Sequence, residues 1–327
     1  MPPSPELNSS PATTRPALFD LQVNGFAGVD FQQPQLTSSA LRVAVDSLRA
    51  HSVHRILLTL ITDNLDRMAG QLARIEAIRE SDPVLNETIV GYHLEGPYLS
   101  SVEGYHGAHP PQLMRSPDVA EFRQLNAAAG NRLRLLTLAP ELPGSSELIR
   151  AARQAGVLVS LGHTNANDTQ IDAAIAAGAT LCTHLGNGVP AHLPRHDNVI
   201  QRLLARDELT ACFIPDGLHL PPFVLRNLVR AKPAGKVILT SDAMAAAAAP
   251  PGRYTLGHVT VEVGADGIVR EPGKSNFAGS SLTLDRGVLN ATRWLGLSED
   301  AAWKLGSIRV AELFGVTLPL IARAKFA

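Results

Sequence analysis

The stretch that decides the fold is His93-Leu94-Glu95-Gly96-Pro97-Tyr98. It follows an apolar run at residues 88–92, which is typical of a buried strand, and the Gly-Pro pair ends that strand. A carboxylate directly after a core strand costs several kcal/mol unless it is paired or binds a metal. Glu95 therefore indicates a strand end with a functional carboxylate.

Three later segments repeat this design. Residues 157–163, 179–184 and 236–242 each place a His or an Asp at the end of an apolar strand. A single residue of this kind is typical of a capped strand end. Four of them on successive strand–helix units indicate instead a shared metal site at the mouth of a barrel.

Eight apolar segments alternate with segments of helical spacing. Strands are predicted at residues 17–23, 54–61, 88–93, 132–138, 157–161, 179–183, 209–214 and 237–240. The alternation predicts parallel pairing, and the count matches an α/β fold of the (β/α)₈ TIM-barrel type. A doubly wound open sheet is the alternative, but it would gather its site at one switch point rather than around strands three, five, six and eight.

The alternation ends after Asp242, which suggests four regions. Residues 1–16 are rich in Pro and Ser and are predicted to be a disordered lead-in, and residues 17–244 form the barrel. Residues 245–278 are expected to form a small β appendage with three short strands. Residues 279–327 contain helical spacing at 282–295 and 298–314, and we expect these two helices to pack on the barrel.

The composition excludes several classes of protein. Among the 327 residues, 29 Lys and Arg nearly balance 30 Asp and Glu, so no electrostatic footprint points to nucleic acid or to an anionic membrane. No apolar run reaches about 18 residues, and the N-terminus does not resemble a signal peptide. Cys182 and Cys212 both lie in apolar runs, typical of buried thiols in a reducing compartment. We therefore expect a cytoplasmic protein.

Polar residues at the predicted strand ends supply candidate ligands. They are Gln22, Asn24, Glu95, His163, His184, Asp216, His219 and Asp242. One carboxylate and two imidazoles, from Glu95, His163 and His184, make a three-ligand open site in which a metal can lower the pKa of water. A free Asp242 suits the base that relays a proton to a leaving group.

The first and fourth strands indicate one metal rather than two. Many metal hydrolases on this barrel begin with His-x-His, where this chain has Gln22-Val23-Asn24, and the strand at 132–138 has no lysine that could bridge two metals. We expect one divalent metal ion per chain. Zinc is the expected ion, and iron, cobalt and manganese are alternatives for the same ligands.

Eight short motifs, in order along the chain, carry a resemblance to a known family. They are Asp20-Leu21-Gln22-Val23-Asn24-Gly25, His93-Leu94-Glu95-Gly96-Pro97, Gly107-Ala108-His109-Pro110, Gly162-His163-Thr164, Thr183-His184-Leu185-Gly186-Asn187, Asp216-Gly217-Leu218-His219, Ser241-Asp242-Ala243-Met244 and Ala278-Gly279-Ser280. Together they resemble the N-acetylglucosamine-6-phosphate deacetylase family of the amidohydrolase superfamily. The resemblance spans roughly residues 20–314.

The resemblance implies roles for the matching positions. Glu95, His163 and His184 would bind the metal, and Asp242 would be the catalytic acid and base. His109 would be a second catalytic residue that polarises the acetyl carbonyl. The implied substrate-binding residues are Ala108, Asn187, Gly188, Arg195 and His219. Arg195 stands where the family places a phosphate-binding arginine that sometimes reaches across a dimer, so a homodimer is expected.

The chain departs from the family pattern in two ways. The family has a β segment before the first barrel strand and a closing strand that joins it, and we expect both to be missing, with only the appendage left of that second domain. Gly186 and Gly188 replace larger residues beside Asn187, in the loop that would contact the ligand.

The sequence thus predicts a metal-dependent hydrolase that converts N-acetylglucosamine 6-phosphate to glucosamine 6-phosphate and acetate, in amino-sugar metabolism. One alternative is an amidohydrolase for another N-acyl amino sugar or amino acid. A second alternative is a non-catalytic barrel that serves as a binding module. Asp242 favours an enzyme, because a binding module has no need for a base.

Overall fold

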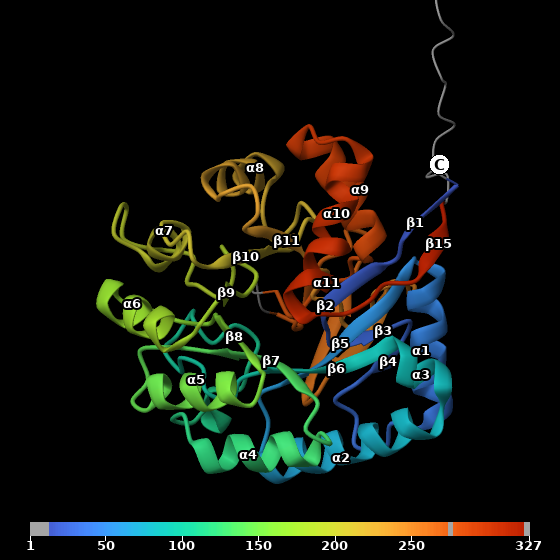
Figure 1. Cartoon of the computed structure of the whole chain (residues 1–327), viewed down its shortest axis with the longest axis horizontal. Helices are drawn as coiled ribbons and strands as arrows, with labels where there is room; N and C mark the ends of the chain where they lie inside the picture. The colour runs from blue at the N-terminus through green and yellow to red at the C-terminus, as the bar shows by residue number, and fades with distance from the viewer. Residues whose placement is uncertain (1–12, 274–276, 324–327) are drawn as a thin grey trace, which may run out of the picture.

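The computed structural model describes residues 13–273 and 277–323. Its central sheet has eight parallel strands in the order β2-β5-β6-β7-β8-β9-β10-β11. These strands are β2 (Leu18–Val23), β5 (Val53–Ile61), β6 (Ile89–Glu95), β7 (Leu133–Leu138), β8 (Leu158–Leu161), β9 (Leu181–Cys182), β10 (Thr210–Phe213) and β11 (Val237–Leu239). Helices surround them (Figure 1), which confirms the predicted barrel.

The helices of the barrel lie between its strands, as the predicted alternation requires. They are α1 (Ser38–Ala50), α2 (Leu65–Ser81), α4 (Val119–Ala128), α5 (Ser145–Gln154), α6 (Asp168–Ala177), α7 (Val199–Leu204) and α8 (Pro222–Ala231). Several begin at a polar cap, as when the Asn167 side chain accepts from the backbone of Gln170. A further short helix, α3 (Pro83–Thr88), starts from the Asp82 cap, directly before β6.

The barrel is nearly closed by contacts between its first and last strands. A single bridge pairs Val23 with Ala243, beyond the end of β11. The buried Asp20 side chain accepts a hydrogen bond from Thr240 Oγ1 at 2.7 Å and from the Ser241 backbone N–H at 3.2 Å. These hydrogen bonds join the first and last strands of the barrel, where the backbone ladder between them is incomplete.

The barrel interior changes from apolar to polar along its axis. The layer farthest from the carboxyl ends of the strands is apolar. It packs against the last helix, α11 (Ile308–Phe314), where the Phe19 and Phe314 ring centroids lie 5.6 Å apart. The layer above it consists of Thr59, His93, Thr137, Ser160 and Thr183, linked by hydrogen bonds of 2.6–3.3 Å. Burial lowers the pKa of His93 to about 4, so its ring is neutral. The floor of the barrel mouth is therefore a fixed, internally bonded polar layer.

The two chain ends differ from the prediction. Residues 1–12 lie outside the described residues, but β1 (Thr14–Pro16) pairs antiparallel with β15 (Leu320–Ala322), and the two strands lie side by side in Figure 1. The prediction of disorder up to residue 16 is therefore wrong for β1, and the prediction of no closing strand is wrong for β15. Each strand is short and is stabilised by a partner some 300 residues away, which local composition does not reveal.

The final helical segment is broken where one continuous helix was predicted. After α9 (Leu284–Leu295), the chain forms α10 (Glu299–Leu305) and then α11. At the break, the Gly306 carbonyl accepts from the Phe19 backbone N–H at 2.9 Å, and Ser307 Oγ donates to the Ala17 carbonyl at 2.8 Å. The backbone at the break bonds the first barrel strand instead of continuing the helix.

The predicted β appendage is present as a three-stranded antiparallel sheet. It contains β12 (Gly252–Leu256), β13 (Val259–Val263) and β14 (Val269–Arg270). The Gly257 backbone N–H donates to Asp30 Oδ2 at 2.9 Å, and His258 Nε2 lies 2.9 Å from Asp63 Oδ2. Both contacts attach the appendage to loops of the barrel, where β3 (Gly25–Phe26) and β4 (Val29–Asp30) form a small hairpin.

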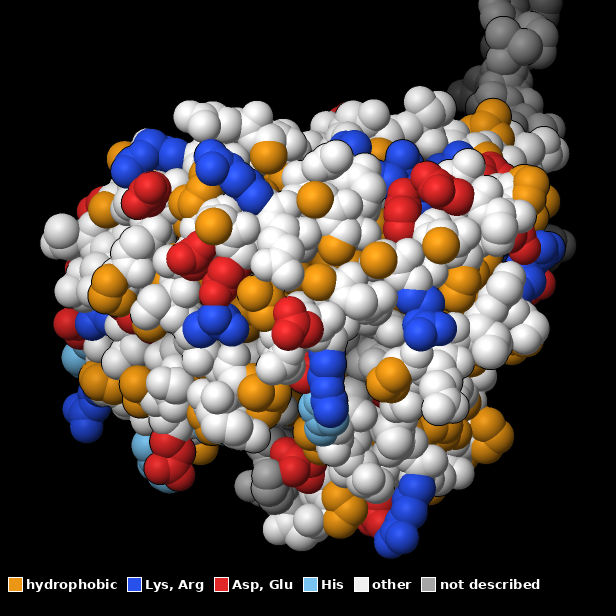
Figure 2. Space-filling view, turned by 90° about the horizontal axis from the view of Figure 1, so that it is seen from below, with side chains coloured by type: hydrophobic (Ala, Val, Ile, Leu, Met, Phe, Trp, Pro, Cys, Tyr) orange, Lys and Arg blue, Asp and Glu red, His pale blue; other side chains and the backbone are white. Residues whose placement is uncertain are grey.

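In Figure 2, basic and acidic side chains are intermixed across the visible face. Within the described ranges, no helix is both long and apolar enough to cross a membrane.

Candidate metal centre and active site

Glu95, His163 and His184 meet at the carboxyl end of the barrel. One potential ligand atom from each residue lies within 4.8 Å of the others, and all three side chains are buried. Glu95 Oε1 lies 2.9 Å from His184 Nε2 and 3.3 Å from His163 Nε2. Glu95 ends β6, and the histidines follow β8 and β9, so parallel strands bring the three groups to the same rim.

The protonation of His163 supports a cation at this cluster. His163 Nδ1 lies 2.8 Å from the Tyr105 carbonyl oxygen, and a carbonyl can only accept, so Nδ1 carries the proton. That bond leaves Nε2 directed at Glu95 Oε1, 3.3 Å away, and a cation placed between the two atoms would contact both. The donor set of one carboxylate and two imidazoles fits a divalent metal such as zinc.

The electrostatics of Glu95 also suit a ligand. Burial alone would raise the pKa of its carboxyl group. Hydrogen bonds from His109, His163 and His184 outweigh burial and hold that pKa well below its usual range. Glu95 is therefore ionised, as a metal ligand must be.

Three residues of the site have strained backbones. The φ angles of His163, His184 and Asp242 are 50°, 26° and 51°, in the left-handed region that only a few per cent of non-glycine residues adopt. Such a conformation costs about 1–3 kcal/mol per residue and is kept only where its surroundings enforce it. Three such conformations therefore occur together at the rim that holds the candidate site.

Asp242 is buried at the same rim, and its carboxyl group interacts with the charge of Glu95. Its side chain is 8% exposed, and Asn24 Nδ2 donates to its Oδ1 at 2.8 Å. Burial, with a smaller contribution from the charge of Glu95, raises the pKa of Asp242 to about 8. Its carboxyl group can therefore exchange a proton near neutral pH.

His109 joins the cluster from the loop that follows β6. Its Nε2 lies 3.6 Å from Glu95 Oε2, and its ring centroid lies 4.6 Å from that of His163. The Thr62 backbone N–H donates to Nδ1 at 3.4 Å, and the tautomer that accepts this bond keeps its proton on Nε2. Burial lowers the pKa of His109, so a neutral imidazole presents an N–H donor to the cluster.

His219 is held by two neighbours at the end of the strand-seven unit. Its Nδ1 lies 2.6 Å from Asp216 Oδ2, and its ring lies edge-on to Phe277 with 4.8 Å between centroids. Asp216 Oδ1 also accepts from the backbone N–H of Leu218 and of His219 itself. The ring is thus fixed through one nitrogen and one face.

The structure explains the two glycines beside Asn187. Gly186 and Gly188 have φ angles of 100° and 63°, and a Cβ on Gly188 would lie 2.9 Å from His163 Nδ1. Asn187 Nδ2 donates to the His184 carbonyl at 3.1 Å, which ties this loop to a cluster residue. A Cβ on Gly107, next to the partly buried Ala108, would also lie close to this ring, 2.8 Å from Cε1. The two loops therefore pack directly against His163.

Arg195 is not brought to the cluster within one chain. Its side chain is exposed on the loop between β9 and α7, and it makes no hydrogen bond or ion pair with the residues that the structure describes.

Two contributors to the site had no sequence signal. Tyr105 acts through its carbonyl oxygen, and Thr62 acts through its backbone N–H together with its hydroxyl, whose oxygen lies 3.0 Å from His109 Nδ1. Backbone groups carry no residue-type pattern, so sequence reasoning could not single them out.

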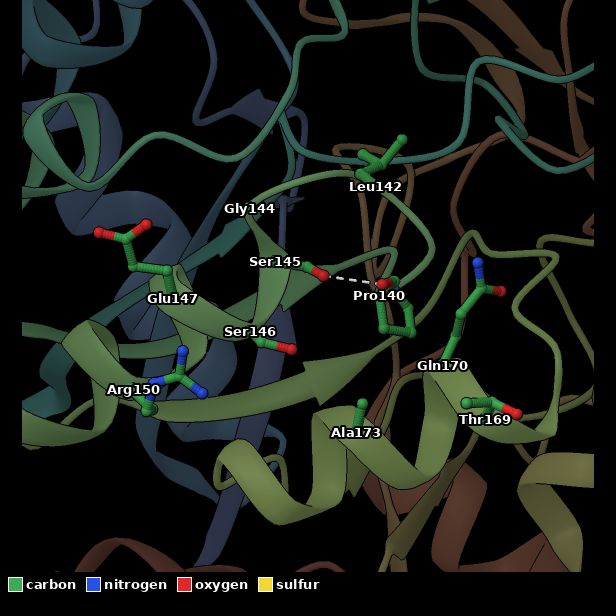
Figure 3. A pocket seen from close by; sticks show the side chains of 10 residues that line it. All are labelled: Pro140, Leu142, Gly144, Ser145, Ser146, Glu147, Arg150, Thr169, Gln170 and Ala173. Atoms are coloured by element: carbon green, nitrogen blue, oxygen red, sulfur yellow. Dashed lines mark hydrogen bonds between the residues drawn. The ribbon is translucent and has the colours of Figure 1, made fainter.

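A separate surface hollow of about 450 Å³ lies between α5 and α6 (Figure 3). Its lining includes Glu147, Arg150 and Gln170, and Ser145 Oγ donates to the Pro140 carbonyl at its edge. None of the ten residues lining it belongs to the predicted site.

Comparison with known proteins identifies close relatives. No protein-family model matches the chain. It is 36% identical over 313 residues to N-acetylglucosamine-6-phosphate deacetylase from Bos taurus, covering 92% of this chain and 74% of the relative. It is 33% identical over 306 residues to N-acetylgalactosamine-6-phosphate deacetylase from Escherichia coli O157:H7, covering 92% and 78% of the two chains.

A solved structure agrees with these relatives. A mutant of N-acetyl-D-glucosamine-6-phosphate deacetylase from Mycobacterium smegmatis, in complex with N-acetyl-D-glucosamine 6-phosphate, superposes with a TM-score of 0.85. The two sequences are 31% identical, and the match covers 95% of this chain and 81% of the other.

Proposed function

Because the chain belongs to the N-acetylglucosamine-6-phosphate deacetylase family of amidohydrolases, we propose that it hydrolyses the acetamide of N-acetylglucosamine 6-phosphate. Water adds its oxygen to the acetyl carbon, the C–N bond breaks, and the products are acetate and glucosamine 6-phosphate. The observation that carries this proposal is the buried cluster of Glu95, His163 and His184, with Asp242 and His109 beside it. A binding module would not need this arrangement.

The proposed cofactor is one divalent metal ion per chain, held by Glu95, His163 and His184. When bound, such an ion acidifies water and polarises a carbonyl group. Zinc is the proposed identity, and the same ligands suit iron, cobalt and manganese.

The remaining steps fall to side chains of this chain. Asp242 accepts a proton from the attacking water and donates it to the amine as the C–N bond breaks. His109 donates from Nε2 to the acetyl oxygen, where negative charge develops. We propose that Ala108, Asn187, Gly188 and His219 contact the sugar. The fixed ring of His219 and the close approach of Gly107 and Gly188 to His163 support these roles.

The identity of the sugar phosphate is the first testable point. We expect purified, metal-loaded protein to release acetate from N-acetylglucosamine 6-phosphate with a kcat/KM higher than for any other N-acetyl compound. The E. coli relative makes N-acetylgalactosamine 6-phosphate the second candidate. Assays of both phosphates, of the unphosphorylated sugars and of N-acetyl amino acids decide between them. A preference for an amino acid would contradict the sugar assignment.

Arg195 is proposed to bind the substrate phosphate. Replacing it with alanine should raise the KM for N-acetylglucosamine 6-phosphate and leave unphosphorylated N-acetylglucosamine nearly unaffected. A fork of guanidinium donors matches phosphate oxygens, and loss of a desolvated pair costs roughly 2–5 kcal/mol. Steady-state kinetics on both sugars test this. An equal effect on the two sugars would show that Arg195 does not recognise the phosphate.

We propose a homodimer, in which the exposed Arg195 of one chain can reach the site of the other. The three-stranded appendage supports this, because β12 stands at one edge of its sheet and exposed edges tend to be covered. Light scattering at micromolar concentration measures the mass directly. We further propose a cytoplasmic location, supported by two buried free cysteines. The proposed domains are the barrel at residues 17–244, the appendage at 245–278 and the C-terminal helices at 279–327.

A further inference from the structure

Asp242 needs an external support to hold its carboxylate in place. Its backbone φ is 51°, and the residue lies beyond the end of β11, outside the regular ladder of the barrel. A strained residue without ladder hydrogen bonds keeps its conformation only if neighbouring segments enforce it.

Two segments distant in the sequence hold the backbone on either side of Asp242. On one side, Asn24 N–H donates to the Ala243 carbonyl at 2.7 Å. On the other side, Ser280 N–H donates to the Asp242 carbonyl at 3.0 Å, and Ser280 Oγ donates to the Ser241 carbonyl at 2.5 Å. The sequence analysis gave no function to the Ala278-Gly279-Ser280 motif. Through Ser280, this motif supports the backbone of Asp242.

The side chain of Asp242 is held by Asn24 alone among the described residues. Asn24 is 2% exposed, and its Nδ2 donates to Asp242 Oδ1 at 2.8 Å. Asn24 Oδ1 is buried and has no hydrogen-bond partner in the described part of the chain. Turning the amide over would place an acceptor against the carboxylate, so this bond selects the amide orientation.

We propose that Asn24 is a positioning residue for Asp242, which holds Oδ1 so that Oδ2 is the oxygen that takes the proton from water and gives it to the amine. This inference rests on the proposed function. An amide N–H suits the task because it donates to one carboxylate oxygen and, unlike an acid, does not compete for the proton. It also gives a role to the asparagine that stands in place of the second histidine of a His-x-His pair.

The test combines kinetics with a double-mutant cycle. Asn24→Leu keeps the approximate shape and removes the donor, and Asn24→Ala is the smaller second variant in case leucine disturbs folding. Each should lower kcat by about tenfold or more, with KM and metal content close to wild type. In an Asp242→Asn background, Asn24→Leu should change kcat less than twofold, because residues that act as a unit are not additive.

Three outcomes would overturn the proposal. They are a kcat within twofold of wild type in both variants, an equal loss of kcat in the Asp242→Asn background, and a loss of metal that parallels the loss of kcat.

A structural readout keeps this inference separate from the proposed function. Crystal structures of wild type and of Asn24→Leu should show one orientation of the Asp242 carboxylate in the first and a displaced one in the second. An unchanged orientation would overturn the inference whatever the substrate is. Failure of the wild type to deacetylate any sugar phosphate, with the carboxylate displaced in the variant, would instead overturn only the proposed function.

Discussion

Asp242→Asn is expected to lower turnover of N-acetylglucosamine 6-phosphate by about 10²-fold or more. The amide is nearly the same size as the carboxylate, and its oxygen can still accept the Asn24 bond, so fold and position should persist. What is lost is the ability to take a proton from water and return it to the amine. Acetate release, measured with substrate in excess, gives the change in kcat.

Metal content and thermal unfolding of the same variant separate this cause from others. Both should match wild type, because Asp242 is not among the three grouped ligands. Near-normal turnover would mean that the base lies elsewhere.

The second large effect concerns the ligand cluster. Wild-type protein should bind about one divalent ion per chain, and a His163→Ala, His184→Ala double variant should bind almost none. Removing both imidazoles leaves Glu95 as the only one of the three grouped ligands, so deacetylation should also fall to background. Elemental analysis after dialysis against metal-free buffer measures the stoichiometry.

An exposed histidine provides the matched control. His258→Ala, in the appendage, should retain both metal and activity, since that side chain is nearly half exposed and contacts Asp63 rather than the cluster. Two tightly bound ions in wild type, or full occupancy in the double variant, would refute the mononuclear site.

The sequence predicted the barrel and the grouping of Glu95, His163 and His184. Strand and helix periodicity is local, so a short window of sequence is enough to place each element. In a parallel barrel every strand points its carboxyl end to the same rim. Polar residues that follow different strands therefore meet in space, and their spacing along the chain does not have to be known.

Arg195 illustrates where this reasoning stops. Its proposed role came from the position of the residue relative to a family motif, and the single chain leaves it exposed and without a described partner. The rule about strand ends does not apply to a residue in the middle of a long loop, whose path depends on packing.

What the sequence determined by itself was the alternation of elements and the chemical type of residue at each strand end. The tertiary structure decided the pairing of β1 with β15, the helix break at Gly306, the bond from His163 to Tyr105 and the bond from Asn24 to Asp242. Each of these joins segments far apart in the chain, often through backbone atoms or a single side chain. Such contacts have no period and no characteristic residue type, so the sequence does not reveal them. They form only when the folded chain brings these distant segments together.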